Sequence, residues 1–575
     1  MMLDKIILIG LIGIVFFVPV VVTDSTTVGF TLPKQLLAQV LLSIVILAWM
    51  IKVRKGTVPK QGQSPRENRT VPILKTPLDM AIIVFLIFVL ASFRNTTNSS
   101  VSLKGFTNIV GYVLLYYMIA GNLKKYEHIR WMAGAIVLAG LFVSILGIFE
   151  YMGFNIFKWE KPVTQQVQMW VTMGNSNAVA QYLIMVIPVA IGIMLHSKNF
   201  KWMIVWACII SIIGSCLILT FAKGAWLGLS GALLFFVALN ARKKVALMFL
   251  TGVAAVLFIT GLFANGRLTQ IFREEDKDAT FSGRVAMWQS SIKMIQVHPF
   301  LGSGLNNFYL LFPKFQVSKF NEVLPNRRPM QVHNDYIQLA VEVGILGLAA
   351  FLWIVVRYMK YGMSIIKSSN RDKWLTSGLV CGIIALLIHS LTDFGLQMPT
   401  PAMMMWAFMG ITVAAGEGKG TVPGKRDSPR RQGFLWVIYA IFVILVLNYS
   451  LMPFMAHLAY QRGNELIVSG RLKSAVKEYE KAVRLDNSLT DGHSTLGSVY
   501  AEQGLYDKAI EELKKAVQID NYNIEARISL AGVHRRLGEY DKSVDELKFV
   551  IDINPNLTLA RSLLEMVYEE AKRAP

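Results

Sequence analysis

Residues 336–356 of this chain are YIQLAVEVGILGLAAFLWIVV, an apolar run that directly follows His333, Asn334 and Asp335. The run contains one charged side chain, Glu342. A helix that spans a bilayer needs about 20 mostly apolar residues. The stretch therefore predicts a membrane-spanning helix whose entrance carries a polar, ionisable group.

The composition of the whole chain agrees with a membrane protein. Of 575 residues, 54% are hydrophobic and only 17% are charged, and the mean hydropathy is +0.47. A soluble domain has about 25% charged residues, so the composition argues against a soluble, disordered or collagenous chain. Three cysteines are too few for a disulfide scaffold. Cys208, Cys216 and Cys381 fall inside predicted spans without metal-type spacing, and we expect them to be small core residues.

The same criterion applied along the chain predicts thirteen spans, a count that we hold to within about one. We interpret the first span as a retained helix because no small-residue cleavage site follows it. The thirteen segments lie near residues 4–22, 35–52, 78–93, 105–121, 131–152, 178–196, 202–221, 224–240, 245–264, 336–356, 374–393, 401–416 and 433–455.

The net charge of +21 belongs to the hydrophobic part of the chain. Residues 456–575 carry 17 Lys and Arg against 19 Asp and Glu, so residues 1–455 carry the whole excess, a net +23. Of the 41 basic residues before 456, 26 lie in alternate connections, as expected if the N-terminus and those connections are cytoplasmic. The charge therefore sets orientation, and we expect no nucleic-acid partner. Thirteen spans place the loop at 265–335 and the C-terminal tail outside the cytoplasm.

The tail contains a sequence repeat. Gly470, Gly504 and Gly538 are 34 residues apart, and they begin GRLKSAVKEYEKAV, GLYDKAIEELKKAV and GEYDKSVDELKFVI. This period and pattern resemble the tetratricopeptide repeat, which implies stacked pairs of antiparallel helices. The chain is thus predicted to be all-α: a polytopic membrane helix bundle over residues 1–455, followed by an α-solenoid of about three repeats over residues 456–575. We expect a protein partner on its concave surface; the alternative is that it only caps or rigidifies the membrane domain.

The loop at 265–335 has a helical pattern of its own. Val285, Trp288, Ile292 and Ile295 recur at helical spacing and predict an amphipathic helix over 284–297, with Arg284 on the same side as Trp288. The sequence HPFLGSG at 298–304 ends that helix. The loop also contains Asp276-Lys277-Asp278, but this DxD match lies in an acidic, solvated run, and we expect neither a metal nor a cofactor.

Several motifs together resemble the O-antigen ligase and polymerase superfamily. They are Arg284-x3-Trp288, then HPFLGSGLNNF from His298, then HNDYIQLAVEVGILG from His333, with GNSNAVAQYL from Gly174 and TFAKGAWLGL from Thr220 upstream. The resemblance covers about residues 1–416. The usual Arg of the last motif is Lys223 here, which keeps a cation but loses the bidentate fork.

The resemblance implies transfer of a glycan from a polyprenyl diphosphate carrier to an acceptor hydroxyl, at the extracytoplasmic face of a bacterial inner membrane. The leaving diphosphate needs cations placed in advance, and the hydroxyl needs a base. We expect His333 to be the general base or to orient the acceptor. Arg284 and Lys223 are expected to bind the diphosphate, with Arg267 and Arg328 as further substrate-binding cations.

Five other side chains are expected to lie in or near this site. Asn177 and Asn334 would orient the sugar or the histidine. His389 and Asp393 lie one helical turn apart in the eleventh span, and we expect a structural pair that closes the site from behind. Glu342 is expected to be buried and partnered, without an assigned role.

Alternatives stay open. A ligase and a polymerase share the donor chemistry and differ in the acceptor, which could be a lipid A core sugar, a protein hydroxyl or another carrier-linked chain. A transporter of the same lipid-linked glycan would be expected to show duplicated halves, and none is visible. A non-catalytic scaffold that displays the repeats would not need His333 or Arg284.

Overall fold

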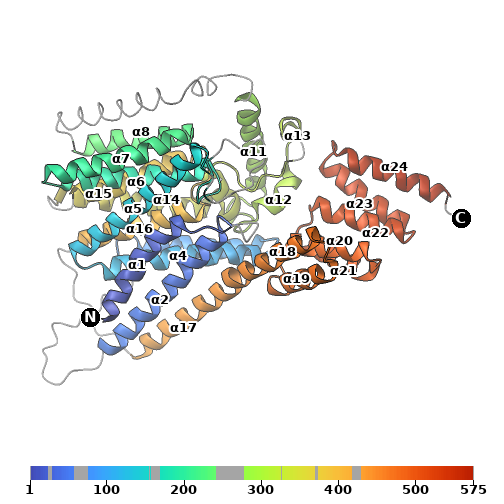
Figure 1. Ribbon diagram of the computed structural model, residues 1–575, viewed down its shortest axis with the longest axis horizontal. Coiled ribbons are helices and arrows are strands. Elements are labelled where there is room, and N and C mark those ends of the chain that lie inside the picture. The colour runs from blue at the N-terminus through green and yellow to red at the C-terminus, as the bar shows by residue number, and fades with distance from the viewer. Residues whose placement is uncertain are drawn as a thin grey trace.

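The structure is a computed structural model that describes residues 2–23, 29–56, 76–154, 156, 169–240, 277–324, 327–368, 373–417 and 429–573. Within these ranges the regular elements are all helices, with no strand, which confirms the predicted fold class. Figure 1 shows a bundle of long helices with a smaller array of short helices at one end.

The bundle is built from the predicted spans. They correspond to the helices α1 (Met2–Val20), α2 (Leu32–Gly56), α3 (Asp79–Ala91), α4 (Ser99–Asn122), α5 (Tyr126–Tyr151), α6 (Ser176–His196), α7 (Phe200–Leu219), α8 (Lys223–Asn240), α14 (Asp335–Ser368), α15 (Lys373–His389), α16 (Pro399–Glu417) and α17 (Pro429–Val446). By length and composition alone, nine helices of the described residues could cross a membrane. The predicted span 245–264 lies outside the described residues.

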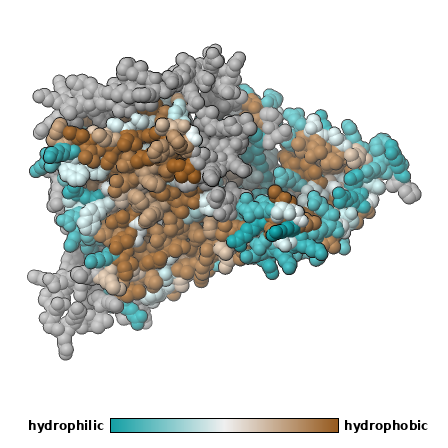
Figure 2. All heavy atoms as spheres, in the orientation of Figure 1, coloured by the Kyte–Doolittle hydropathy of each residue, from teal (hydrophilic) through white to brown (hydrophobic). Residues whose placement is uncertain are grey.

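The core of the bundle forms around α6, whose residues 178–192 are all buried. Helix α15 packs along α6 on one side and against α8 on another, so α15 connects α8 to the buried core. Large apolar side chains such as Ile9, Leu90, Trp202 and Leu234 are exposed, as expected where lipid replaces water. Figure 2 shows mostly hydrophobic residues over the visible face of the bundle and mostly hydrophilic ones over the array.

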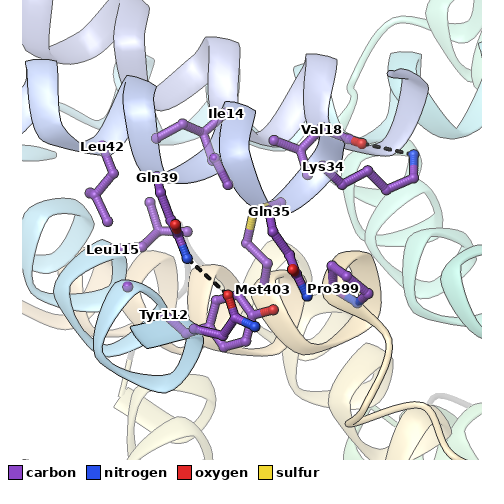
Figure 3. Close-up of a pocket in the computed structure, with 13 residues that line it drawn as sticks. Ile14, Val18, Lys34, Gln35, Gln39, Leu42, Tyr112, Leu115, Pro399 and Met403 are labelled. Atoms are coloured by element: carbon purple, nitrogen blue, oxygen red, sulfur yellow. Dashed lines mark hydrogen bonds between the residues drawn. The ribbon is translucent and has the colours of Figure 1, made fainter. Parts of the chain in front are cut away.

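A buried lysine stabilises the junction of α1 and α2. Lys34 Nζ donates hydrogen bonds to the backbone oxygens of Val18, Pro19 and Val21, at 3.0, 2.9 and 2.7 Å. These carbonyls lie at the end of α1, where they have no partner within the helix. Beside them lies a cavity of about 10 Å³ among α1, α2, α4 and α16, the space of a single water molecule (Figure 3).

The loop at 265–335 is called the outer loop from its predicted topology. Its described residues form a small layer with its own core, built from α11 (Lys277–Val297), α12 (Phe308–Phe315) and α13 (Ser318–Val323). The predicted helix at 284–297 is therefore present, but its buried face differs from the predicted one. Ala286, Met287, Ser290, Ser291 and Met294 are buried, whereas Ile292 is half exposed. Small residues face inward because α11 packs closely on α13 and α14.

The C-terminal array consists of α18 (Met452–Val468), α19 (Leu472–Leu485), α20 (Thr490–Glu502), α21 (Tyr506–Ile519), α22 (Ile524–Arg536), α23 (Tyr540–Ile553) and α24 (Thr558–Arg573). The three repeat glycines have φ of 72–77° and end α18, α20 and α22. After each glycine, the next backbone N–H donates across the turn, for example from Leu505 to Tyr500 O at 2.9 Å. This is the Schellman ending that favours glycine, and it explains why glycine occupies the same position in each 34-residue repeat.

The first repeat helix is continuous with the last span. A π turn over Leu447–Leu451 joins α17 directly to α18, and the predicted domain boundary at 456 falls within α18. No loop separates the membrane helix from the array.

Candidate active site

His333 is held in an unusual backbone conformation. Its φ is +54°, in the left-handed region that a side chain other than glycine rarely adopts. The preceding residue, Val332, is fixed at both ends. Its N–H donates to Gln338 Oε1 at 2.8 Å, and its carbonyl accepts from Trp288 Nε1 at 3.1 Å. Such strain persists where the surroundings over-determine a residue, which is common at functional sites.

The imidazole of His333 faces a buried carboxylate. Its Nδ1 lies 3.3 Å from Asp393 Oδ1, and its ring contacts the Phe394 ring edge-on at 4.8 Å. The side chain of Asp393 is 3% exposed, whereas that of His333 is 30% exposed. The carboxylate therefore lies behind the histidine, and the histidine is the part of the pair that a substrate can reach.

Asp393 lies in the connection between α15 and α16, surrounded by three cationic or ionisable side chains. Burial alone would raise the pKa of Asp393, but His333, His389 and Arg284 hold that pKa below its ordinary value. The carboxylate is thus ionised at neutral pH. A charged Asp393 beside Nδ1 favours a proton on that nitrogen and leaves Nε2 as the basic one.

Arg284 reaches the same connection from the outer loop. Its Nη1 donates to the carbonyl oxygen of Thr392 at 3.0 Å. A guanidinium has five N–H donors, and within the part of the chain that the structure describes this bond uses one of them, which leaves donors for an anion.

The start of α8 lies against the same connection between α15 and α16. A Cβ built at Gly224 would lie 2.7 Å from Thr392 Oγ1 and 3.5 Å from His389 Cε1. The glycine thus allows α8 to begin against the connection after α15, and the exposed Lys223 is its first residue. His389 is buried at the end of α15, and neither ring nitrogen has a hydrogen-bond partner among the described residues. The structure brings Arg284, His333, His389, Asp393 and the start of α8, where Lys223 lies, to one connection.

Behind this cluster, helix α14 is broken at Gly344. Its φ and ψ are 75° and 175°, so the predicted single span is interrupted there. The turn at 298–304 forms backbone hydrogen bonds to α14 on both sides of this break. Ser303 and Gly304 donate to the oxygens of Val341 and Glu342 at 2.8 and 3.0 Å, and Ile345 donates to Pro299 O at 2.8 Å.

This backbone seam between residues 298–304 and 341–345 requires glycine. A Cβ at Gly344 would overlap the carbonyl of Phe300, and one at Gly302 would overlap the backbone of Glu342. Within a membrane-spanning segment, irregular backbone is tolerated only where protein groups satisfy its hydrogen bonds. The seam therefore explains why HPFLGSG and EVGILG occur together in the sequence.

A chain of hydrogen bonds connects the seam to His333. The Glu342 side chain is 1% exposed and its Oε1 accepts from Gln338 Nε2 at 2.6 Å. Gln338 in turn accepts from Val332 N, next to His333. Glu342 thus acts on the histidine through Gln338.

Other predicted residues lie in different settings. Asn334 caps α14, because its Oδ1 accepts from the backbone of Tyr336 and Ile337 at 3.0 Å, and its Nδ2 donates to Leu391 O. Asn177 lies in the first turn of α6. Arg328 does not join the cluster, since its guanidinium pairs with Asp520 of the array. Arg267 and Asp276 lie outside the described residues.

Three residues that shape the site were not predicted as site residues. Trp288 was assigned to an apolar face, although an indole N–H beside a polar segment signals a donor. Gln338 and Thr392 gave no sequence signal, because their contacts depend on the fold. Among the described residues, no three His, Cys, Asp or Glu side chains form a metal-type group.

The comparisons with known proteins agree with the motifs. Residues 206–352 match the family model described as O-antigen ligase, and residues 463–504 and 500–567 match models of the TPR repeat and the tetratricopeptide repeat. These matches confirm the predicted resemblance: a segment similar to the O-antigen ligase model is followed by C-terminal segments that match the tetratricopeptide-repeat models.

Three relatives are named for polysaccharide synthesis. The exopolysaccharide production protein ExoQ of Rhizobium meliloti (strain 1021) is 27% identical over 187 residues, which are 32% of this chain and 40% of that protein. A protein of Rickettsia felis named as a polysaccharide ligase is 32% identical over 88 residues, covering 15% and 21%. Another of Rickettsia typhi is 22% identical over 270 residues, covering 45% and 62%. This chain thus spans less than two thirds of each relative.

Proposed function

We propose, from the O-antigen ligase domain carried by residues 206–352, that this chain is a membrane glycosyltransferase. It would move a glycan from a polyprenyl diphosphate carrier to an acceptor hydroxyl at the extracytoplasmic face of a bacterial inner membrane. The observation that carries the proposal is the convergence of Arg284, the start of α8 and the His333–Asp393 pair on one connection.

The reaction would break the bond between the sugar C1 and the diphosphate oxygen and form a bond from C1 to the acceptor oxygen. The acceptor proton would pass to Nε2 of His333, because Asp393 lies against Nδ1. The diphosphate would leave with the bonding electrons. Its growing negative charge would be stabilised by the free N–H groups of Arg284 and by Lys223.

The proposal needs no metal, because the guanidinium and ammonium groups supply positive charge where the diphosphate would lie. A chelator tests this part directly. The acceptor alternatives are a lipid A core sugar, a protein hydroxyl and another carrier-linked chain.

The test is transfer by the purified full-length protein from polyprenyl-diphosphate glycan to each class of acceptor, with and without chelator. We expect His333→Ala to lower kcat by about 10²–10⁴-fold, the usual contribution of a general base. Arg284→Ala should lower kcat as well, and His128→Ala, on the opposite side of the bundle by predicted topology, should change neither kcat nor KM.

Three outcomes would count against the proposal. Absence of product with every acceptor opposes the enzyme. Undiminished product from His333→Ala and Arg284→Ala opposes the assigned site. Loss of product with chelator opposes metal-independent chemistry.

A further inference from the structure

Two equivalent positions of the repeat array contact the membrane domain. Asp486 and Asp520 are 34 residues apart, and each directly follows the second helix of a repeat. Both are buried, at 7% and 3% exposure. Asp486 accepts from Lys104 Nζ of α4 at 2.7 Å, and Asp520 accepts from Arg328 of the outer loop at 2.6 and 2.8 Å. The repeat period therefore matches the separation of two cations on the membrane domain.

The Arg328 contact uses most of that side chain. The guanidinium binds Asp520 with two parallel bonds, the strongest arrangement for such a pair. Its Nε donates to Tyr309 O at 3.0 Å, and its plane lies 3.9 Å from the Tyr309 ring. Few donors are left for a substrate diphosphate, which is the role predicted for Arg328 from the sequence.

These contacts lead to His333 by short routes. Arg328 fixes α12 to the array and lies five residues before His333 in the same segment. On the other side, Asn98 Nδ2 donates to Ile519 O of the array, and its N–H donates to Asn307 Oδ1. Asn307 follows Gly304, which belongs to the seam with α14. The array thus contacts the segment before His333 directly, through Arg328, and it is connected to the seam indirectly, through Asn98 and Asn307.

We propose that the docked array is part of the catalytic unit, with Arg328–Asp520 and Lys104–Asp486 as positioning pairs that hold the 327–334 segment and therefore His333. This inference rests on the proposed function for its effect on turnover, but its effect on the loop is independent of activity. It assigns Arg328 to holding the array instead of the diphosphate.

The test is a charge swap in the full-length protein. Arg328→Asp and Asp520→Arg should each lower kcat about tenfold with little change in KM, and each should speed hydrogen exchange of residues 327–334. The double variant Arg328→Asp/Asp520→Arg should recover most of both, because the ion pair is restored with reversed polarity. Arg327→Asp, an exposed neighbour with the same change of charge, is the matched control and should behave like wild type.

The second pair gives an independent check. Lys104→Asp and Asp486→Lys should speed exchange at residues 98–104, and their combination should reverse it. Lys104 is on α4, so a swap there restores docking without altering the outer loop's own charges.

The possible results separate the two roles of Arg328. If Arg328 binds the diphosphate, Asp520→Arg alone should leave kcat intact and the double variant should stay as defective as Arg328→Asp, which would overturn the inference. Unchanged exchange at 327–334 in the single variants would overturn it too. If wild type transfers nothing while the exchange pattern follows the swap, the docking stands and the proposed function fails.

Discussion

At the residue scale, His333 combines a strained backbone with a fixed charge partner. The φ of +54° is maintained because Val332 is bound on both sides and Asn334 begins the next helix. The side chain is therefore aimed by its neighbours instead of by its own rotamer preference. The cost of such a conformation is of order 1–3 kcal/mol, which the surrounding hydrogen bonds must offset.

The indole of Trp288 provides a test of this aiming. Trp288→Phe keeps an aromatic ring but removes the hydrogen bond to Val332 O, which is worth about 1 kcal/mol. We expect kcat of the transfer reaction to fall about fivefold, at nearly constant KM, because His333 is less often in place. Trp202→Phe, on an exposed face of α7, is the matched control. A change in KM alone would point to substrate contact and contradict positioning.

At the element scale, the seam of residues 298–304 with the broken helix α14 fixes the outer layer to the bundle. Gly344→Ala would force a Cβ against Phe300 O at a φ of +75°. We expect a loss of about 2 kcal/mol or more in the free energy of unfolding, seen as a lower thermal midpoint in detergent. Hydrogen exchange at residues 299–304 should rise.

A matched control exists within the bundle. Gly134 lies inside α5, and a Cβ there would meet nothing within 4 Å. Gly134→Ala should therefore be neutral or stabilising by up to about 1 kcal/mol. Equal effects at both glycines would show that the seam has no special requirement.

The sequence predicted the elements well and their irregularities poorly. Long apolar runs are detectable one by one, so each predicted span within the described residues has a helix. The break at Gly344 was hidden inside an apolar run, because its cause is a turn 40 residues earlier in the chain. The buried face of α11 was misplaced for a similar reason, since Ser290 and Ser291 face inward only through close packing on other elements.

In the candidate site, too, residues that motifs mark could be predicted, whereas contacts that depend on the fold could not. Lys223, Arg284, His333, His389 and Asp393 are predicted from motifs and spacing. The structure brings the last four of them, together with the start of α8 that carries Lys223, to one connection. Arg328 was grouped with them as a cation of the same loop. Its two bonds to Asp520 depend on how the array docks, and nothing local in the sequence indicates that contact.

At the scale of the whole molecule, the array and the outer loop lie on the same side of the bundle, because Arg328 contacts Asp520. We expect a reporter that is active only outside the cytoplasm to be active when fused after residue 575. A fusion after Lys124, between α4 and α5, should be inactive. Activity in the reverse pattern would place the array and the loop in the cytoplasm together.

The docking contact should also depend on pH in a defined way. Burial alone would raise the pKa of Asp486, but Lys104 and Ser488 hold that pKa below its ordinary value. The contact therefore adds stability above about pH 4 and loses it as the pH falls through the lowered pKa.

The measurement is the difference in thermal midpoint between wild type and Asp486→Asn. We expect a constant difference from pH 8 to pH 5 that disappears in stronger acid, where the aspartate is protonated. In a Lys104→Met background the difference between pH 8 and pH 5 should be smaller. A difference that is unchanged by Lys104→Met would show that Asp486 acts through other partners.

The continuous helix through the π turn at 447–451 also places a geometric constraint on this chain. Each residue in a helix turns the chain by about 100° and advances it by 1.5 Å. When a helix leaves the bundle without a break, its number of residues therefore determines the rotation of the attached array about the helix axis. One residue more or fewer would rotate Asp486 and Asp520 away from both cations. A π turn is equivalent to one inserted residue, so the turn itself sets the rotational orientation in which the array meets the membrane domain.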